Sequence, residues 1–231
     1  DNYNEFARKI SLYVSKKKID HILNFIGNND NSLFPINGKN ILRDNYVLPL
    51  VLVNLFKKKK ISFTFFLSTE IDKVDKPNEN SLYSLSKFFL QDSLRFFSTK
   101  NNISFIKIDN VYGPHDLNFN RLVPSLMLKL LFYNKKIKVN FAQKKKLIYV
   151  KDLLPIIFKT FKNKKTFNII NVKGKTYNIS KLWKNINEAL LNKHKNINKN
   201  NACYNFIETL MWYKHNLSAI KKEAKKYHKT I

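Results

Sequence analysis

The chain has 231 residues, of which 44% are hydrophobic and 14% aromatic. Such a chain can bury a real core, which excludes a disordered protein and predicts one domain, or one domain with a small lobe. No apolar stretch reaches the roughly 20 residues of a transmembrane helix, so we expect no membrane association. The start shows no signal-peptide pattern, and a single cysteine, Cys203, excludes an internal disulfide. These features favour a cytoplasmic protein.

The net charge of +27 raises the possibility of nucleic-acid binding. Lysine supplies nearly all of it, because only four of the 43 basic residues are arginines: Arg8, Arg43, Arg95 and Arg121. Nucleic-acid-binding proteins favour arginine forks and aromatic platforms, whereas these lysines form short scattered runs. Lysine and asparagine also rise together in genomes rich in A and T. Nucleic-acid binding is therefore the least favoured of the functions considered.

The first half of the chain alternates predicted strands and helices. An apolar run over Ile19–Asn28 reaches a glycine and predicts a buried parallel strand. Asp44 can cap a helix that extends to Phe56, with Pro49 in its first turn or at a kink. The β-branched and aromatic run Ile61–Leu67 predicts a second strand, which ends at Ser68 and Thr69.

A polar loop over Glu70–Ser81 leads to Tyr83 and to a helix that extends to Phe97. A third strand is predicted over Ile103–Ile108, followed by a turn at Asn110–Pro114. Alternating short apolar strands and helices predict an α/β domain with a mostly parallel sheet. The remaining predictions are helices from Pro124 to Tyr133, Asp152–Phe161, Ser180–Leu191 and Leu217–Tyr227, and strands at Ile137–Asn140, Leu147–Val150 and Thr166–Val172.

The candidate catalytic pair is Tyr83 and Lys87. A tyrosine and a lysine four residues apart on a helix share one face, so the ammonium lies beside the phenol. A nearby cation favours the phenolate form and makes the phenol a usable acid or base for a sugar or alcohol hydroxyl. Thr69, at the end of the preceding strand, can orient the reacting oxygen. Alone, this spacing also occurs by chance on a solvated helix face.

Several segments resemble, in order, the extended short-chain dehydrogenase/reductase family, the NAD-dependent epimerases and dehydratases that act on nucleotide sugars. Tyr83 to Lys87 matches the tyrosine and lysine motif of this family, and residues 109–114, DNVYGP, match its NVYGP turn. The other similar segments are IDHILNFIGN (19–28), DNYVLPL (44–50), FFLSTE (65–70), KKLIYVKDL (145–153), TFNIINVKG (166–174) and the C-terminal helix.

The resemblance implies a Rossmann-like, doubly wound, mostly parallel sheet with a small C-terminal α/β substrate lobe. The expected boundaries are 1–122 for the remainder of the dinucleotide-binding domain and 123–231 for the substrate-binding lobe with the last Rossmann elements. It also implies NAD or NADP as cofactor, a nucleotide sugar as substrate, and a homodimer formed through a four-helix bundle.

The resemblance assigns a role to each candidate site residue. Tyr83 is the general acid/base, Lys87 holds the nicotinamide ribose and tunes the tyrosine, and Thr69, or else Ser68, binds the substrate oxygen. The expected cofactor-binding residues are Ile26, Gly27, Asn45, Tyr83, Lys87 and Val111. The expected substrate-binding residues are Ser68, Glu70, Asn110, Arg121 and Lys145, with Lys145 in place of an arginine that contacts nucleotide phosphate. Dispersed histidines give no metal-ligand spacing.

One family feature is absent from the sequence. Four glycines, Gly27, Gly38, Gly113 and Gly174, cannot form the glycine-rich turn that cradles the pyrophosphate. We therefore expect that the first two or three strands are missing from this sequence, that the chain binds cofactor poorly, and that its sheet has an unpaired edge. A catalytically inactive relic or binding module of the same fold remains the alternative to an enzyme.

Overall fold

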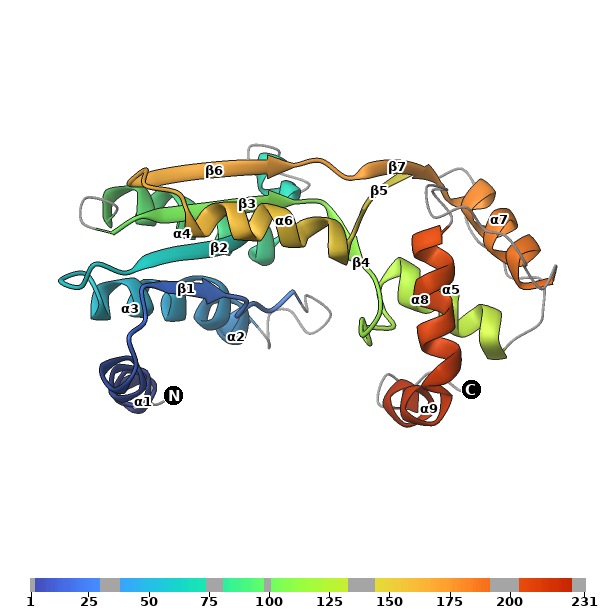
Figure 1. Ribbon diagram of the computed structural model, residues 1–231, viewed down its shortest axis with the longest axis horizontal. Helices are drawn as coiled ribbons and strands as arrows, with labels where there is room; N and C mark the ends of the chain where they lie inside the picture. The colour runs from blue at the N-terminus through green and yellow to red at the C-terminus, as the bar shows by residue number, and fades with distance from the viewer. Residues whose placement is uncertain are drawn as a thin grey trace. The chain divides into compact units, whose positions relative to one another are not determined.

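The computed structural model describes residues 3–29, 38–73, 81–97, 101–132, 144–191 and 204–225. Its contacts divide the chain into two compact units. The first unit comprises residues 1–109 and 155–172, and the second comprises residues 110–154 and 173–231. Each is described by itself (Figure 1). Among the described helices, none has the length and apolar character that a membrane span requires.

The first unit is built on a four-stranded sheet in the order β1-β2-β3-β6. Its strands are β1 (His21–Asn24), β2 (Ser62–Ser68), β3 (Ile103–Ile108) and β6 (Phe167–Val172), and every pairing is parallel. The predicted parallel α/β sheet is confirmed, and β1 is its edge strand among the described residues. Parallel strands all end at the same edge, so β1, β2 and β3 bring the residues that follow them together.

The two faces of this sheet carry different side chains, because successive residues of a strand point to opposite faces. Phe63, Phe65 and Phe105 are fully buried on one face. They pack with Leu52, Val53, Leu90 and Leu94 of helices α3 (Leu48–Leu55) and α4 (Leu82–Phe97), beside Val14 of α1 (Tyr3–Lys16). On the other face lies α6 (Val150–Phe161), whose Thr160 accepts a hydrogen bond from Thr64 of β2 at 2.8 Å.

The helical segment after β1 differs from the prediction. It begins by Gly38 rather than Asp44, and it runs through α2 (Gly38–Leu42), a π-helical turn η1 (Arg43–Val47) and α3. Asp44 is not an N-cap; it lies inside the π turn and pairs with Arg43 at 2.7 Å. Pro49 lies two residues after this turn and has no N–H to donate to the carbonyl of Asn45. The wider π turn therefore stands where an α-helical hydrogen bond from residue 49 could not form.

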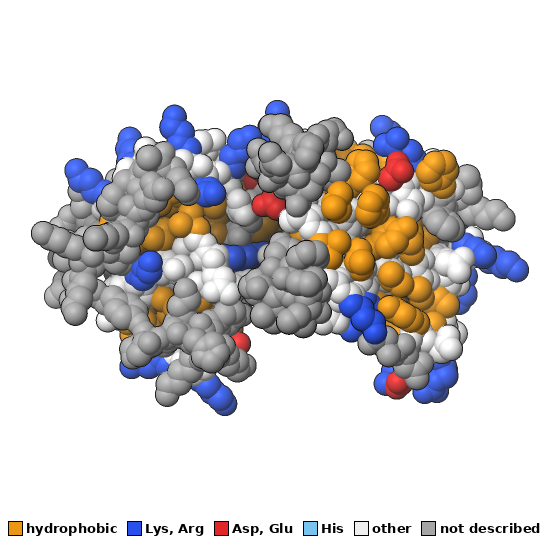
Figure 2. Space-filling model, turned by 180° about the vertical axis from the view of Figure 1, so that it is seen from behind, with side chains coloured by type: hydrophobic (Ala, Val, Ile, Leu, Met, Phe, Trp, Pro, Cys, Tyr) orange, Lys and Arg blue, Asp and Glu red, His pale blue; other side chains and the backbone are white. Residues whose placement is uncertain are grey.

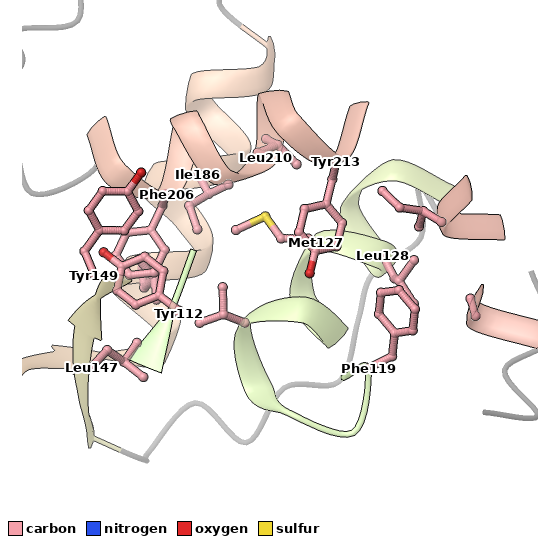
Figure 3. Packing of buried hydrophobic residues seen from close by; sticks show 14 residues of the cluster. Tyr112, Phe119, Met127, Leu128, Leu147, Tyr149, Ile186, Phe206, Leu210 and Tyr213 are labelled. Atoms are coloured by element: carbon pink, nitrogen blue, oxygen red, sulfur yellow. The ribbon is translucent and has the colours of Figure 1, made fainter. Parts of the chain in front are cut away.

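The second unit has a three-stranded sheet in the order β4-β5-β7. Its strands are β4 (Asn110–Tyr112), β5 (Lys144–Tyr149) and β7 (Lys175–Asn178). Helices α5 (Leu122–Phe132), α7 (Ile179–Leu191), α8 (Tyr204–His215) and α9 (Leu217–Lys225) supply the rest of the core. Figure 3 shows Tyr112 and Phe206 face to face in this core, with ring centroids 4.2 Å apart.

Several elements of the second unit also depart from the prediction. Asn110–Tyr112 is a short strand rather than only a turn, since it pairs in parallel with β5. Ser180 does not cap α7, because Asn178 does so by accepting the backbone N–H of Lys181 at 3.2 Å. Helices α1 and α8 and strand β7 were not predicted. The strand predicted at 137–140 lies outside the described residues.

Candidate functional site

The loop after β1 is held in place by two asparagine side chains. Asn24 accepts the backbone N–H of Ile26 at 3.3 Å. Asn45, which is fully buried in the π turn, accepts the N–H of Asn28 at 2.9 Å and donates to the carbonyl of Asn28 at 2.6 Å. Asn45 thus bonds both backbone polar groups of Asn28, as a neighbouring strand would. Together with the bond from Asn24, this fixes the path of the chain through Gly27.

Gly27 provides the space in which Lys87 lies. A Cβ atom at Gly27 would lie 3.3 Å from the Nζ atom of Lys87 and 3.2 Å from the Oδ1 atom of Asn45. These distances are tighter than ordinary van der Waals contacts, so a side chain here would push the ammonium or the amide away. The structure therefore brings together Gly27, Asn45 and Lys87, which the sequence assigned to one cofactor-binding site.

Lys87 is a buried ion, with only 6% of its surface exposed. Burial lowers its pKa from 10.5 to about 8, because the charged form loses hydration. A lysine has a flexible stem that usually carries its charge into water, so an ammonium held inside the unit is costly. Such a cost is common at functional sites, where the charge is needed at a fixed place.

Tyr83 is placed by the start of α4. Ser81 caps this helix, since its Oγ atom accepts the backbone N–H of Ser84 at 3.1 Å. Tyr83 is therefore the second residue of α4, half-buried, and Lys87 follows one turn later on the same face. The helical placement of the pair agrees with the expected arrangement.

Thr69 and Asp109 meet just beyond the ends of neighbouring strands. Ser68 of β2 is in register with Ile108 of β3, so the next residue of each strand lies side by side. Thr69 donates its hydroxyl proton to Asp109 at 2.7 Å. Ser68 instead accepts the N–H of Glu70 at 3.1 Å, which leaves the serine hydroxyl proton able to donate elsewhere.

A second cluster of candidate residues lines a pocket within the second unit. The pocket has a volume of about 190 Å³ and lies at the first turn of α5. Three of the five predicted substrate-binding residues, Asn110, Arg121 and Lys145, line it together with Val111. The partial positive charge of a helix N-terminus adds to these two cations, so the pocket is suited to an anion.

Arg121 is held at this pocket by Asp116. The Nη1 atom of Arg121 lies 3.6 Å from the Oδ2 atom of Asp116, whose other carboxylate oxygen accepts the N–H of Asn118 at 3.2 Å. Burial raises the pKa of Asp116, and the guanidinium opposes that shift. A partly buried carboxylate thus restrains an arginine that is otherwise about half exposed.

Sequence reasoning missed Asp109, Asp116 and the loop asparagines Asn24 and Asn28. A signal was present for Asp109, because it follows a predicted strand just as Thr69 does, and neighbouring parallel strands end together. No such signal marks Asp116, whose contact with Arg121 depends on the fold of the turn between β4 and α5. Ser68 and Glu70 lie beside Thr69 in the first unit rather than at the pocket.

The described residues match part of a dinucleotide site. Gly27, Asn45 and Lys87 form a cradle that a single Cβ would fill, at the edge of the sheet where the strands end. None of the described glycines lies in a glycine-rich turn between a strand and a helix, so these residues offer no seat for a pyrophosphate. Within the described part of the chain, no cluster of acidic, histidine or cysteine side chains could hold a metal ion.

A family model for the NAD dependent epimerase/dehydratase family matches residues 7–180, well over half of the chain. The chain belongs to this family. Its members depend on NAD, so NAD is the cofactor that the cradle at Gly27 and Lys87 would have to accommodate. The expected family is thereby confirmed over residues 7–180. This segment contains both candidate clusters but not the C-terminal helices.

Solved structures share the fold at low sequence identity. The Bordetella bronchiseptica enzyme WbmF, in complex with NAD+, is 17% identical and has a TM-score of 0.77, over 94% of this chain and 79% of WbmF. UDP-N-acetylglucosamine 4-epimerase from Methanobrevibacter ruminantium is 18% identical with a TM-score of 0.74, over 91% of this chain and 81% of the epimerase. dTDP-glucose 4,6-dehydratase from Bacillus anthracis is 18% identical with a TM-score of 0.73, over 94% and 79% of the two chains. No curated protein sequence matches the chain.

The burial of Lys87 predicts a stability cost that depends on pH. The pKa of Lys87 is about 8 in the folded protein against 10.5 for an ordinary lysine, which corresponds to roughly 3 kcal/mol. At pH 7 both states are protonated and the folded state bears the full cost. Between pH 8 and 10.5 only the unfolded state keeps the proton, so stability rises with pH in that window. Lys87→Met should therefore raise the free energy of unfolding at pH 7 by about 1–3 kcal/mol.

This gain should shrink as the pH rises from 8 to 10.5, as measured by urea denaturation at several pH values. Lys159→Met, at an exposed position of α6, is the matched control and should change the free energy of unfolding little at any pH. A Lys87→Met variant that is less stable than the wild type at pH 7 would contradict the buried-charge account.

Proposed function

We propose that the chain carries the catalytic and substrate-binding parts of an enzyme that epimerises, dehydrates or reduces a nucleotide-linked sugar. The observation that supports it most is the buried Lys87, one helical turn from Tyr83 and held against Gly27 beside Asn45. A fixed cation next to a phenol favours the phenolate, which is the base that removal of a sugar hydroxyl proton requires. When bound, NAD supplies the hydride acceptor.

In this proposal Tyr83 takes the proton from the hydroxyl of the reacting carbon and returns it when the carbonyl is reduced. The ammonium of Lys87 stabilises the phenolate that exists before the first transfer and again after the second, and it can also hydrogen-bond a ribose hydroxyl. Its lowered pKa does not prevent this role, since a pKa of about 8 leaves the lysine mostly protonated at pH 7.

Thr69 orients the substrate oxygen in the proposal, and the contact with Asp109 refines how it does so. The hydroxyl of Thr69 gives its proton to the carboxylate of Asp109, so it can only accept a hydrogen bond from the substrate, and it suits a sugar hydroxyl next to the reacting one, whose own proton goes to Tyr83. Ser68, which keeps its own proton to donate, is suited to the carbonyl oxygen that forms after oxidation. Thr69 would then orient the sugar through the adjacent hydroxyl, and Ser68 would bind the reacting oxygen.

The pocket at the start of α5 supports the assignment of a nucleotide substrate. Arg121 and Lys145 offer two cations at the wall of a cavity of about 190 Å³, and Leu122, Val123 and Leu147 offer apolar contacts beside them. Charge next to an apolar wall suits a diphosphate that carries a nucleoside. Three of the solved structures with this fold are described with UDP or a UDP-containing ligand: one with UDP-N-acetylmuramic acid, one with UDP-glucose and one with NAD+ and UDP.

The two clusters should have separable effects on catalysis and on binding. Tyr83→Phe removes the proposed acid/base but not the pocket. Turnover of UDP-N-acetylglucosamine, measured with NAD in large excess because the described residues offer no pyrophosphate seat, should fall at least about 100-fold while UDP affinity stays unchanged. Lys145→Gln should weaken UDP binding roughly tenfold, since it removes one charged contact. Isothermal titration with UDP and a steady-state assay measure the two effects.

Lys146→Gln is the matched control for the pocket, because the neighbouring residue of β5 points to the opposite face. Turnover that survives Tyr83→Phe would refute the catalytic role. Equal loss of UDP affinity in Lys145→Gln and Lys146→Gln would refute the pocket and leave only a general effect of charge. Binding of UDP by a wild-type chain without turnover would support the alternative of a binding module.

A homodimer is part of the proposal, and the apolar face of the first unit supports it. Figure 2 shows apolar side chains gathered on the face that η1, α3 and α4 form. Phe89 is 45% exposed there, edge-on to Tyr46 with ring centroids 6.3 Å apart. An exposed phenylalanine on α4 that packs on a half-buried tyrosine of η1 is typical of a surface that another copy covers.

Phe89→Asp should convert the dimer to a monomer, because the interface would bury an unpaired carboxylate. Sedimentation should then give a mass near 27.4 kDa instead of about twice that value. Phe158→Asp, at a position on α6 that is more exposed than Phe89, is the control and should leave the dimer intact. A wild-type chain that sediments as a monomer at all concentrations would contradict the proposed dimer.

A further inference from the structure

The lysine runs of the first unit meet at one edge of its sheet. All four strands are parallel and begin together at this edge (Figure 1). The segments that enter β1, β2 and β6 carry ten lysines, all of them exposed: Lys16–Lys18, Lys57–Lys60, and Lys162, Lys164 and Lys165. Runs that are scattered along the sequence are therefore neighbours in the fold. We call the surface formed by these ten lysines the amino edge.

The segments at the opposite edge of the same sheet have the opposite charge. Among the described residues of this unit, the segments that leave β1, β2 and β3 contain one lysine, Lys73, against three acidic residues, Glu70, Asp72 and Asp109. The segments of the amino edge contain one acidic residue, Asp20, against ten lysines. A lysine-rich composition would act on both edges alike, so composition does not account for this asymmetry.

A buried amide fixes the turn that carries four of these lysines. Asn101, just before β3, donates its side-chain N–H groups to the carbonyls of Phe56, Lys59 and Ile61 at 3.3, 2.9 and 3.0 Å. The turn therefore holds Lys57–Lys60 close together although their charges repel one another. Such repulsion destabilises the folded unit until an anion lies against the surface.

Two exposed apolar side chains accompany the amino edge at the end of α1. Leu12 and Tyr13 are 49% and 62% exposed. They precede Lys16 by four and three residues, so they share its side of the helix. At the surface of a bilayer, leucine enters the acyl chains and tyrosine favours the boundary between lipid and water.

We infer that the amino edge docks on the surface of a bilayer that contains anionic phospholipids. An ammonium group attracts lipid phosphates without a fixed bonding geometry, and each lysine close to such a surface strengthens association roughly fivefold. Neighbouring strands lie about 4.8 Å apart, so the row of entry segments from β1 to β6 is about 15 Å wide and can meet a flat surface at several points. A contact of this kind requires no apolar span.

The side chains at this edge favour a lipid surface over nucleic acid. Nucleic-acid sites use arginine forks for phosphates and aromatic platforms for bases. The ten cations of the amino edge are all lysines, and the neighbouring Arg95 lies over the ring of Phe167, 5.5 Å from its centroid. Leu12 has no ring on which a base could stack, whereas acyl chains accept it.

Docking at the amino edge leaves the proposed catalytic residues free. Thr69, Gly27 and the loop that contacts Lys87 follow the strands at the other edge of the sheet. Strand β2 has seven residues, so the two edges are about 20 Å apart, which exceeds the roughly 8 Å over which charges act at physiological salt. Docking and catalysis are therefore separable.

Flotation of the full chain with lipid vesicles tests the inference. At about 0.1 M salt the chain should bind phosphatidylcholine vesicles that contain about one third phosphatidylserine, and it should not bind pure phosphatidylcholine. A variant that combines Lys57→Gln, Lys58→Gln, Lys59→Gln and Lys60→Gln should bind at least about 20-fold more weakly. Its side chains are exposed and the turn is held through backbone carbonyls, so the variant should fold.

The matched control makes the same change of charge at four exposed lysines of the second unit, and it should bind within about threefold of the wild type. It combines Lys173→Gln, Lys181→Gln, Lys214→Gln and Lys222→Gln. Leu12→Ser should weaken binding at least about threefold. Met211→Ser, at a 42% exposed position of the second unit, should not weaken it. Tyr83→Phe should bind as the wild type does, so the result does not depend on the proposed activity.

Absence of binding to the anionic vesicles by the wild type would overturn the inference. So would an equal loss of binding in the two lysine variants, which would show a general effect of charge. Tighter binding to polyuridylate than to the vesicles at equal phosphate concentration, lost in the variant of Lys57–Lys60, would assign the amino edge to nucleic acid instead.

Discussion

The site depends on the burial of one ammonium group. Lys87 lies inside the first unit because Gly27 has no side chain and because Asn45 ties the loop after β1 to the helical segment. The π turn that carries Asn45 ends two residues before Pro49, which has no N–H for the carbonyl of Asn45 and lies in the first turn of α3. The loop, the π turn and the helix of Tyr83 therefore meet at this ammonium, and its burial costs stability that the packed core must offset.

The chain divides the chemistry between two units. The first holds the proposed acid/base pair and the hydroxyl groups of Ser68 and Thr69, all at the ends of parallel strands or at the start of α4. The second holds a cationic pocket at the first turn of α5. Membership of the NAD dependent epimerase/dehydratase family explains why both are present in one chain. It does not explain how the pyrophosphate of NAD is held, because the described residues offer no seat for it.

The sequence predicted strands and helices well where local patterns are strong. β3 was predicted at its observed bounds because ISFIKI is apolar, β-branched and followed by a turn. The helix start was wrong at Asp44, since nothing local distinguishes an N-cap from an aspartate inside a π turn. The contacts of Asp109 and Asp116 join residues brought together only by the fold. The placement of Tyr83 and Lys87 one turn apart on one face was predictable because both residues lie within one helix.

The titration of Lys87 tests the central claim most directly. In ¹³C-detected spectra of the full chain, the Cε resonance of Lys87, assigned by its loss in Lys87→Met, should titrate with a pKa of about 8. Gly27→Ala should move this value, because the new Cβ would displace the ammonium. A pKa for Lys87 at the ordinary 10.5 would show an exposed lysine and contradict the account, along with the role proposed for its partner Tyr83.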